Sequence, residues 1–298
     1  MANVYQLDIG SLPTVASNTK TQLQIPKYGR IFGLMLQFSA AGAPLTDLQL
    51  VNDVSLIRVV ADGQEIHSIS GKNLIIWMNR EFGAYANGNV LQTAAANGVL
   101  FIPFANMAYS DYLNQSASAL GTKDIQNLFL EVTFGALITA TACAVSVMND
   151  VVQANWTQYL SFTTFPQTLI AGENEIQQLP KEPDVTVLNY QIVNSNVGIS
   201  LDKSQILVNS TPFVQLPKVI ARVKEAITKR LTQIPCTGSV AALTALDATF
   251  LDFNPTRDLA SGLSLNGVVD QRLKLTYTGA PGAVDIVRCS LRNHAYKA

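Results

Sequence analysis

The sequence predicts an all-β protein with a few helices, built from two tandem eight-stranded jelly-roll β-sandwiches with one flanking helix each. Three observations predict this fold class. The length of 298 residues favours two domains over one. Short runs of alternating apolar and polar residues, separated by turn residues, recur along the chain and are typical of strands. The order of these runs in the first half is repeated in the second half.

The repeat begins with a proline pair in each half. In the first half the order is Leu12-Pro13, an alternating run at 21–25, Pro26 and a β-rich run at 31–38; in the second it is Phe165-Pro166, 174–179, Pro180 and 185–193. Proline lacks the N–H that a ladder needs, so it ends each alternating run. The shared order and spacing indicate a duplicated unit.

Two hairpins and two closing strand pairs continue the repeat. The first-half runs are 54–60, 64–69, 99–104, 128–134 and 140–148, and their counterparts are 199–208, 211–215, 248–253, 272–278 and 283–291. Asp62-Gly63 predicts a tight two-residue turn in the first hairpin, and Asn209-Ser210 holds the same place in the second. About eight strands per half, with one helix after the fourth strand, suit a jelly roll.

Each half contains one segment with the periodicity of a helix. Ser70 is a candidate N-cap for a helix whose apolar stripe includes Leu74, Met78 and Phe82. In the second half, Pro217 precedes a helix whose apolar stripe includes Val219, Val223 and Ile227. We expect both stripes to pack on a sheet. The predicted domains are residues 1–150 and 151–298, joined through a connection at 149–164.

Charge and cysteine content exclude several classes of protein. Charged residues make up 14% of the chain, and 20 basic residues against 21 acidic ones leave a net charge of −1. No global field attracts nucleic acid, so we expect no sequence-specific nucleic-acid partner. The low charge indicates uncharged surface that neighbouring subunits cover. Cys143, Cys236 and Cys289 lack CxxC spacing and are expected to be buried free thiols.

The sequence resembles the double jelly-roll major capsid proteins of membrane-containing icosahedral bacteriophages, most closely the corticovirus type, with tectivirus capsid proteins and adenovirus hexon as remote relatives. The segments that carry the resemblance are 22–26, 48–64, 74–80 and 173–180. The resemblance implies a homotrimer with a pseudo-hexagonal outline that tiles an icosahedral shell, over an internal lipid membrane. It also implies partners among neighbouring capsomers, minor capsid or penton proteins, and membrane proteins, with a location in the virion capsid after synthesis in the host cytoplasm.

The residues needed for common enzymatic chemistry are scarce. His67 and His294 are the two histidines, and the chain has no GxSxG, Walker or GxGxxG motif. We therefore expect a protein that is not an enzyme and needs no cofactor. The carboxylates near strand ends are Asp47, Asp53, Asp62, Asp202, Asp247, Asp252 and Asp258. They favour turn chemistry, while calcium at subunit interfaces is the alternative reading.

Two other functions stay open from the sequence. One is a receptor- or carbohydrate-binding β-sandwich of the spike type, which needs an exposed aromatic cluster; Trp77 and Trp156 lie far apart in the sequence. The other is a two-jelly-roll hydrolase, which needs two carboxylates about 5–10 Å apart in a cleft. The structural capsid protein, which the resemblance implies, is the function that we favour.

Overall fold

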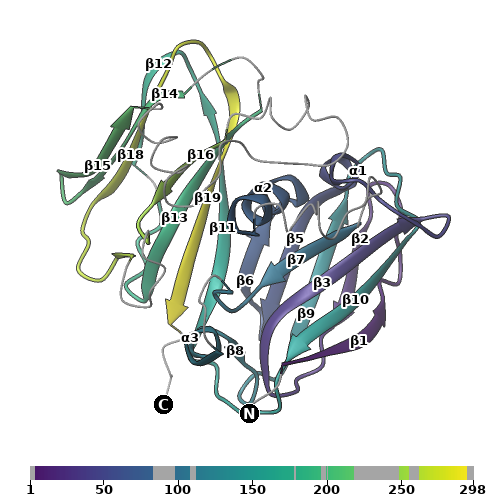
Figure 1. Ribbon diagram of the computed structural model, residues 1–298. Coiled ribbons are helices and arrows are strands. Elements are labelled where there is room, and N and C mark those ends of the chain that lie inside the picture. The colour runs from purple at the N-terminus through teal and green to yellow at the C-terminus, as the bar shows by residue number, and fades with distance from the viewer. Residues whose placement is uncertain are drawn as a thin grey trace. The chain divides into compact units, whose positions relative to one another are not determined.

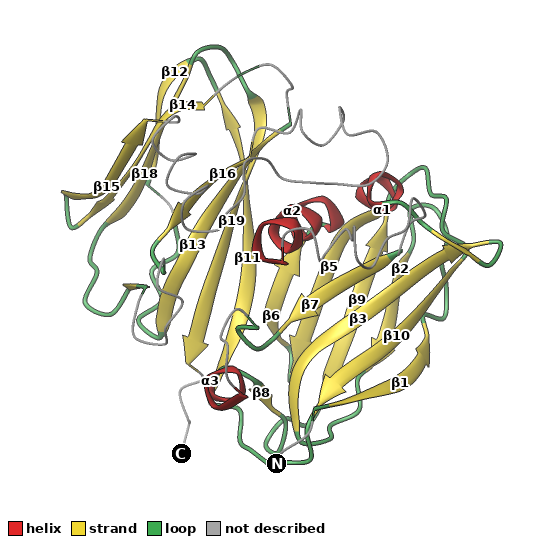
Figure 2. Cartoon of the chain, viewed as in Figure 1, coloured by secondary structure: helices red, strands yellow, loops and turns green. Residues whose placement is uncertain are grey.

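The computed structural model describes residues 4–82, 98–107, 112–177, 179–195, 199, 201–217, 248–254 and 262–293. These residues form two compact units, one with the residues up to Thr163 together with Asn293, the other with 164–292. The chain passes from the first unit to the second within β11 (Gln158–Leu169). Strands make up most of both units, as Figures 1 and 2 show.

The first unit is a sandwich of two antiparallel sheets. One sheet has the order β1 (Tyr5–Ser11), β10 (Ala142–Asn149), β3 (Arg30–Ala40) and β7 (Val99–Pro103), and the short strands β4 (Ala43–Pro44) and β8 (Leu120–Gly121) also pair with β3. The other has the order β2 (Lys20–Gln24), β9 (Leu128–Phe134), β5 (Val54–Ala61) and β6 (Gln64–Ile69).

The second unit repeats this arrangement. One sheet has the order β11, β19 (Gly282–Asn293), β13 (Val185–Asn194) and β16 (Ala248–Asp252), with the short β17 (Leu263–Ser264) also on β13. The other has the order β12 (Gly172–Ile176), β18 (Gln271–Tyr277), β14 (Leu201–Val208) and β15 (Thr211–Pro217).

The same strand order in both units establishes two tandem jelly rolls. When the eight long strands of each unit are counted along the chain, one sheet contains the first, eighth, third and sixth, and the other the second, seventh, fourth and fifth. This is the Greek-key order of a jelly roll. The predicted fold class, all-β with two eight-stranded sandwiches, is confirmed.

Alternation along the strands builds each core. In β9 the side chains of Leu128, Leu130, Val132 and Phe134 are buried and the intervening ones are partly exposed. In β18 the matching positions Gln271, Leu273, Leu275 and Tyr277 are buried in the same pattern. Each fully buried leucine of this kind stabilises the fold by about 1.5–3 kcal/mol.

Three helices lie in the described part of the first unit: α1 (Asp47–Asp53), α2 (Gly71–Phe82) and α3 (Tyr112–Ala117). The predicted N-cap is confirmed, because the Ser70 hydroxyl accepts a hydrogen bond from the Asn73 N–H at 3.2 Å. Helix α2 packs on β5 and β7 (Figure 1). The capping box of Thr46 and Gln49, which starts α1, was not predicted, although both residues suit it.

Two of the three cysteines lie in the described residues. Cys143 and Cys289 are buried thiols outside any disulfide, as predicted, and burial raises the pKa of the Cys143 thiol. Cys236 lies outside the described residues. In the described part of the chain, no helix is long and apolar enough to cross a membrane.

Candidate functional site

The predicted helix residues divide between described and undescribed parts of the chain. Leu74 and Met78 lie in α2 and are buried. Phe82 is the last residue of α2, and its side chain lies outside the described part. The second predicted stripe, Val219, Val223 and Ile227, also lies outside the described residues. The packing of that helix therefore stays a prediction.

His67 lies in the core of the first unit. Its ring is 4.9 Å from the ring of Phe104 and 5.5 Å from that of Phe162, and the Phe162 N–H donates to its Nδ1 at 3.4 Å. Among the described residues, no group of three or more His, Cys, Asp or Glu side chains is arranged to hold a metal ion. His294 lies outside the described residues. The contacts of His67 are those of a core residue.

Three of the strand-end carboxylates, Asp53, Asp62 and Asp252, accept hydrogen bonds from backbone N–H groups. The carboxylate of Asp53 accepts hydrogen bonds from the N–H groups of Thr139 and Ala140 at 2.7–3.0 Å. Asp252 accepts from the Asn254 N–H at 2.8 Å. Asp202 is exposed on β14, and the side chain of Asp47 lies outside the described part, as do Asp247 and Asp258. Backbone N–H groups thus occupy the oxygens that a calcium ion would need at Asp53.

A loop clamp closes one end of the first jelly roll. The β5–β6 turn contains Asp62 and Gly63, both at positive φ. The Asp62 carboxylate accepts hydrogen bonds from the N–H groups of Gln126 and Asn127 at 2.6–3.0 Å, just before β9. The Lys27 ammonium, one residue after Pro26, donates to the Ile125 and Gln126 carbonyls at 3.0 and 2.9 Å. Two elements therefore hold the loop before β9.

The second jelly roll contains the same clamp at the matching positions. Asn209, in the β14–β15 turn, accepts through Oδ1 from the N–H groups of Val269 and Asp270 at 2.8 and 3.1 Å, just before β18. Lys181, one residue after Pro180, donates to the Val269 carbonyl at 2.6 Å. The predicted turns and Pro pairs thus match in the sequence and in their contacts, which indicates duplication of a complete domain.

The clamp predicts a specific pattern of stability. Asp62→Ala is expected to lower the free energy of unfolding by about 1–3 kcal/mol, because two backbone N–H groups lose their acceptor. Asp62→Asn keeps an acceptor oxygen at this turn, as Asn209 does in the second unit, and is expected to cost less than about 1 kcal/mol. Urea unfolding of both variants tests this. Equal losses in the two variants would show that the carboxylate charge, and not the acceptor, stabilises the turn.

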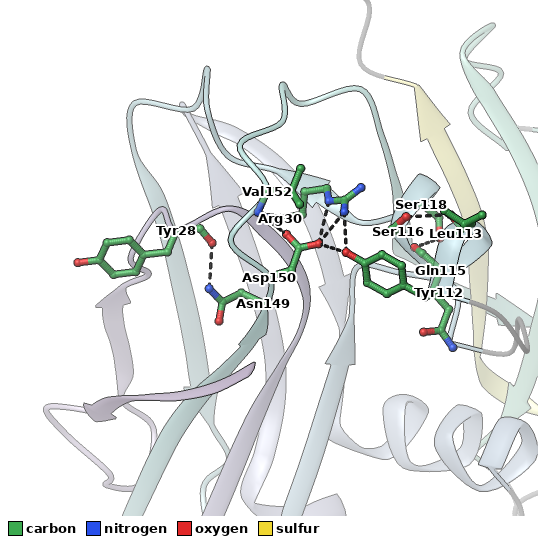
Figure 3. Close-up of polar contacts among 10 residues, drawn as sticks. All are labelled: Tyr28, Arg30, Tyr112, Leu113, Gln115, Ser116, Ser118, Asn149, Asp150 and Val152. Atoms are coloured by element: carbon green, nitrogen blue, oxygen red, sulfur yellow. Dashed lines mark hydrogen bonds and ion pairs between the residues drawn. The ribbon is translucent and has the colours of Figure 1, made fainter. Parts of the chain in front are cut away.

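A buried ion cluster lies at the same end of the first jelly roll, where β10 leads into the connection to β11 (Figure 3). The Asp150 carboxylate is fully buried and accepts from the Arg30 guanidinium at 2.6 and 3.0 Å and from the Tyr112 hydroxyl at 2.6 Å. Its second oxygen accepts from the backbone N–H groups of Arg30 and Val152 at 3.3 and 3.0 Å. Both oxygens are therefore satisfied, as a buried charge requires.

The cluster joins three elements that are distant in sequence: the start of β3, helix α3 and the segment after β10. Burial raises the pKa of Asp150, but hydrogen bonds from Arg30 and Tyr112 outweigh it, so that the pKa is lowered. Burial and the bond to Asp150 raise the pKa of the Tyr112 hydroxyl. The cluster is thus a carboxylate, a guanidinium and a protonated phenol at neutral pH.

Exposed apolar side chains flank this cluster. Tyr28 is 60% exposed, Val151 73% and Leu113 76%, and Val152 is also exposed. Figure 3 shows Tyr28 and Leu113 on opposite sides of Asp150. We call Tyr28, Leu113, Val151 and Val152 the end surface. A rigid polar cluster that carries exposed apolar groups suits contact with another protein surface more than catalysis.

Sequence reasoning did not find the cluster. Asp150 is absent from the predicted strand-end carboxylates, and Arg30 and Tyr112 are separated from it by 120 and 38 positions. No local motif links three residues at such spacing. The cluster depends on the pairing of β10 with β3, which brings Asn149 opposite Ile31 and which the sequence does not reveal.

Comparisons with known proteins agree with the fold. Residues 6–151 match the family model of the viral coat protein P2 N-terminal domain. No curated protein sequence is a significant match. The crystal structure of the major capsid protein P2 from bacteriophage PM2 is similar, with a TM-score of 0.74 and 17% identity, covering 99% of this chain and 100% of that one.

Two further solved structures share the fold. A chain of the Sulfolobus Turreted Icosahedral Virus structure has a TM-score of 0.71 at 13% identity, with 99% of this chain and 92% of that one covered. A chain of the PBCV-1 virus capsid has a TM-score of 0.63 at 12% identity, with 99% and 96% covered. Residues 6–151 thus match a viral coat protein domain, and the whole chain has the two tandem jelly rolls of the double jelly-roll capsid proteins to which it is similar.

Proposed function

We propose that this chain is a viral major capsid protein that forms homotrimers with a pseudo-hexagonal outline, which tile an icosahedral shell. The observation that supports this most is the duplicated jelly roll, with its identical strand order and its matching clamps at Asp62 and Asn209. Three subunits with two similar domains each place six similar domains around a threefold axis. Such a capsomer packs in a hexagonal array with a single kind of chain.

The positions of the strands support a boundary between the two domains. The first jelly roll ends with β10 at Asn149, and the second begins with β11 at Gln158. We therefore propose domains at residues 1–150 and 151–298, with the boundary in the connection just before β11, the strand within which the chain passes between the two compact units. Asp150 holds the start of this connection to the first jelly roll through Arg30.

Exposed apolar groups in both units support assembly through protein contacts. In addition to the end surface, Ile170 is 67% exposed, Phe213 54% and Val269 80%. Charged residues make up only 14% of the chain. The buried cores of subunit interfaces are apolar and depleted in charge, so these side chains fit surfaces that become covered on assembly.

The partners follow from this role. The proposed partners are other copies of the chain within the trimer, neighbouring capsomers, and penton or minor capsid proteins where hexagonal packing cannot close the shell. We further propose an internal lipid membrane beneath the shell, contacted directly or through membrane proteins. We also propose that the chain is synthesised in the host cytoplasm. It is expected not to bind nucleic acid sequence-specifically, not to be an enzyme and not to need a cofactor.

A binding role of the spike type finds less support. Trp77 is 4% exposed and its ring meets the ring of Phe162 at 4.9 Å, while Trp156 is 3% exposed. Sugar platforms require accessible aromatic faces, and both tryptophans are buried. The structural role is therefore the one proposed.

Mass in solution tests the proposed trimer. The purified chain is expected to scatter light as a particle of three 32.2 kDa subunits, and to keep that mass on dilution into the low micromolar range. Six jelly rolls that share a threefold interface bury far more apolar surface than a transient contact does. A monomer at all concentrations would contradict the trimer and favour the binding role.

A further inference from the structure

A second ion cluster lies in the second jelly roll, where the end of β19 meets the loop between β12 and β13. One oxygen of the Glu182 carboxylate accepts from the Arg288 guanidinium at 2.5 Å, and the other accepts from the Arg292 guanidinium at 2.9 Å. The Arg288 side chain is fully buried and that of Arg292 is 15% exposed. Two largely buried guanidinium groups therefore share one carboxylate.

The charge of this cluster is not balanced. Among the described residues, Glu182 is the one carboxylate that forms an ion pair with Arg288 or Arg292, so two positive charges and one negative charge leave a net charge of +1. Arg288 also donates to the Pro180 carbonyl at 2.8 Å and lies over the Phe165 ring, 5.4 Å from its centre. Neither of these contacts supplies a negative charge. An unbalanced charge at a buried position is costly, and a bound counter-charge would remove the cost.

Three polar atoms on the same face of β19 have no hydrogen-bond partner in the described part of the chain. They are Arg288 Nε, Ser290 Oγ and Arg292 Nε, and all three are buried. Side chains two positions apart in a strand lie on one face. Ile286, the preceding member of this series, belongs to the apolar core of the second unit, so the face is the inner one. About nine in ten buried polar groups have a partner, so three such atoms in succession point to a bound acceptor.

The three atoms surround one place. The Nε and Nη2 groups of an arginine lie on the same edge of its rigid guanidinium, and both arginines donate to Glu182 through Nη2. Each Nε is therefore close to Glu182, on the part of that edge nearer the strand. Ser290 lies between the two arginines along β19. An acceptor between Glu182 and β19 would be within reach of both Nε groups and of the Ser290 hydroxyl.

We propose that this place binds one small inorganic anion of the halide class, such as chloride. A halide accepts hydrogen bonds from any direction, so it satisfies all three donors, and its single charge balances the cluster. A water molecule would satisfy the donors but leave the net charge of +1. Arg288 and Ser290 are fully buried, which suits a single atom better than an oxyanion with four oxygens. The Glu182 side chain is 40% exposed, so the cluster reaches the surface on that side.

The anion would connect the end of β19 to the loop between β12 and β13, and the stability of the second jelly roll would then depend on the anion in solution. The ion cluster of the first unit contains one guanidinium and one carboxylate, and it needs no such counter-charge. The proposal concerns a single chain and does not depend on the proposed trimer. Its failure would therefore leave the capsid role untouched.

Crystals of the purified protein grown with sodium bromide test the site directly, because bromide replaces chloride and is located by its anomalous scattering. We expect one bromide within hydrogen-bond distance of Arg288 Nε, Ser290 Oγ and Arg292 Nε. Arg292→Gln is expected to lose it. Arg272→Gln removes an arginine from the β18 surface network with Glu175 and is the matched control, which is expected to keep it. A water molecule or a carboxylate of the chain at this place, without anomalous signal, would overturn the proposal.

Unfolding in urea tests the same site in solution. At equal ionic strength, sodium chloride in place of sodium gluconate is expected to raise the folding equilibrium constant of the wild type by at least about tenfold. Ser290→Ala and Arg292→Gln are expected to respond by less than about threefold. Ser290→Ala keeps both arginines, so it provides the test even if Arg292→Gln does not fold. An equal response in the wild type and Ser290→Ala, or no response in the wild type, would contradict the proposal.

Discussion

Replacing Asp150 by alanine is expected to lower the free energy of unfolding by about 3–5 kcal/mol. The change leaves the Arg30 guanidinium, whose side chain is only 16% exposed, without its carboxylate, and it removes the acceptor of the Tyr112 hydroxyl. An unpaired buried charge costs far more than an exposed pair gains. Denaturant unfolding measures the loss. Asp202→Ala, at an exposed position on β14, is the control and is expected to change stability by less than about 0.5 kcal/mol.

Acid unfolding tests the ionisation of Asp150 in the same cluster. The pKa of Asp150 is lower in the folded chain than in the unfolded chain. Its contribution is therefore fully present above the unfolded-state pKa, about 3.9, and is lost as the pH falls through the lower folded-state pKa. Asp150→Asn removes this titration, so its stability should fall less steeply below about pH 4 than that of the wild type. Parallel curves would show that Asp150 is not ionised in the folded protein.

Gly29→Ala is expected to cost about 3–5 kcal/mol, the second large effect. Gly29 has a φ of 65°, and a Cβ there would lie 1.7 Å from the Asp150 carbonyl oxygen. The backbone of the β2–β3 loop and the segment after β10 would have to separate, which would also disturb the ion cluster. Thermal and denaturant unfolding measure the loss.

Gly63→Ala is the matched control for this substitution. Gly63 also has a positive φ, 81°, but a Cβ there meets nothing within 4 Å. Its cost is expected to be about 1 kcal/mol, from the backbone conformation alone. Equal losses at the two glycines would mean that the loop at Gly29 moves away from Asp150 without cost.

The strands that carry strong local signals could be predicted from the sequence. The predicted run 128–134 is strand β9, and 64–69 is strand β6, because alternation and the Asp62-Gly63 turn are local properties. Strand β1 was missed because it is exposed on both faces and therefore lacks a buried alternation. The first residues of β11 were assigned to the predicted connection at 149–164, because only part of this strand follows a period-two pattern of burial.

The candidate site could not be predicted in the same way. Arg30, Tyr112 and Asp150 come together only after β10 pairs with β3 and α3 closes over them. By contrast, the clamp was partly visible, because the Pro-Lys pairs and the Asp62 and Asn209 turns repeat in the sequence. The sequence did not reveal the partners of Lys27 and Lys181, because each partner is a backbone carbonyl in a distant loop. Backbone acceptors have no signature in the amino-acid order.

Electron microscopy of purified particles that contain this chain tests the central claim, that two jelly rolls per subunit build trimeric capsomers of an icosahedral shell. The account predicts a shell of threefold capsomers with six similar sandwich domains each, into which the strand order of both units fits. Capsomers built from two or five copies of the chain, or particles in which the chain forms only projecting spikes, would contradict it.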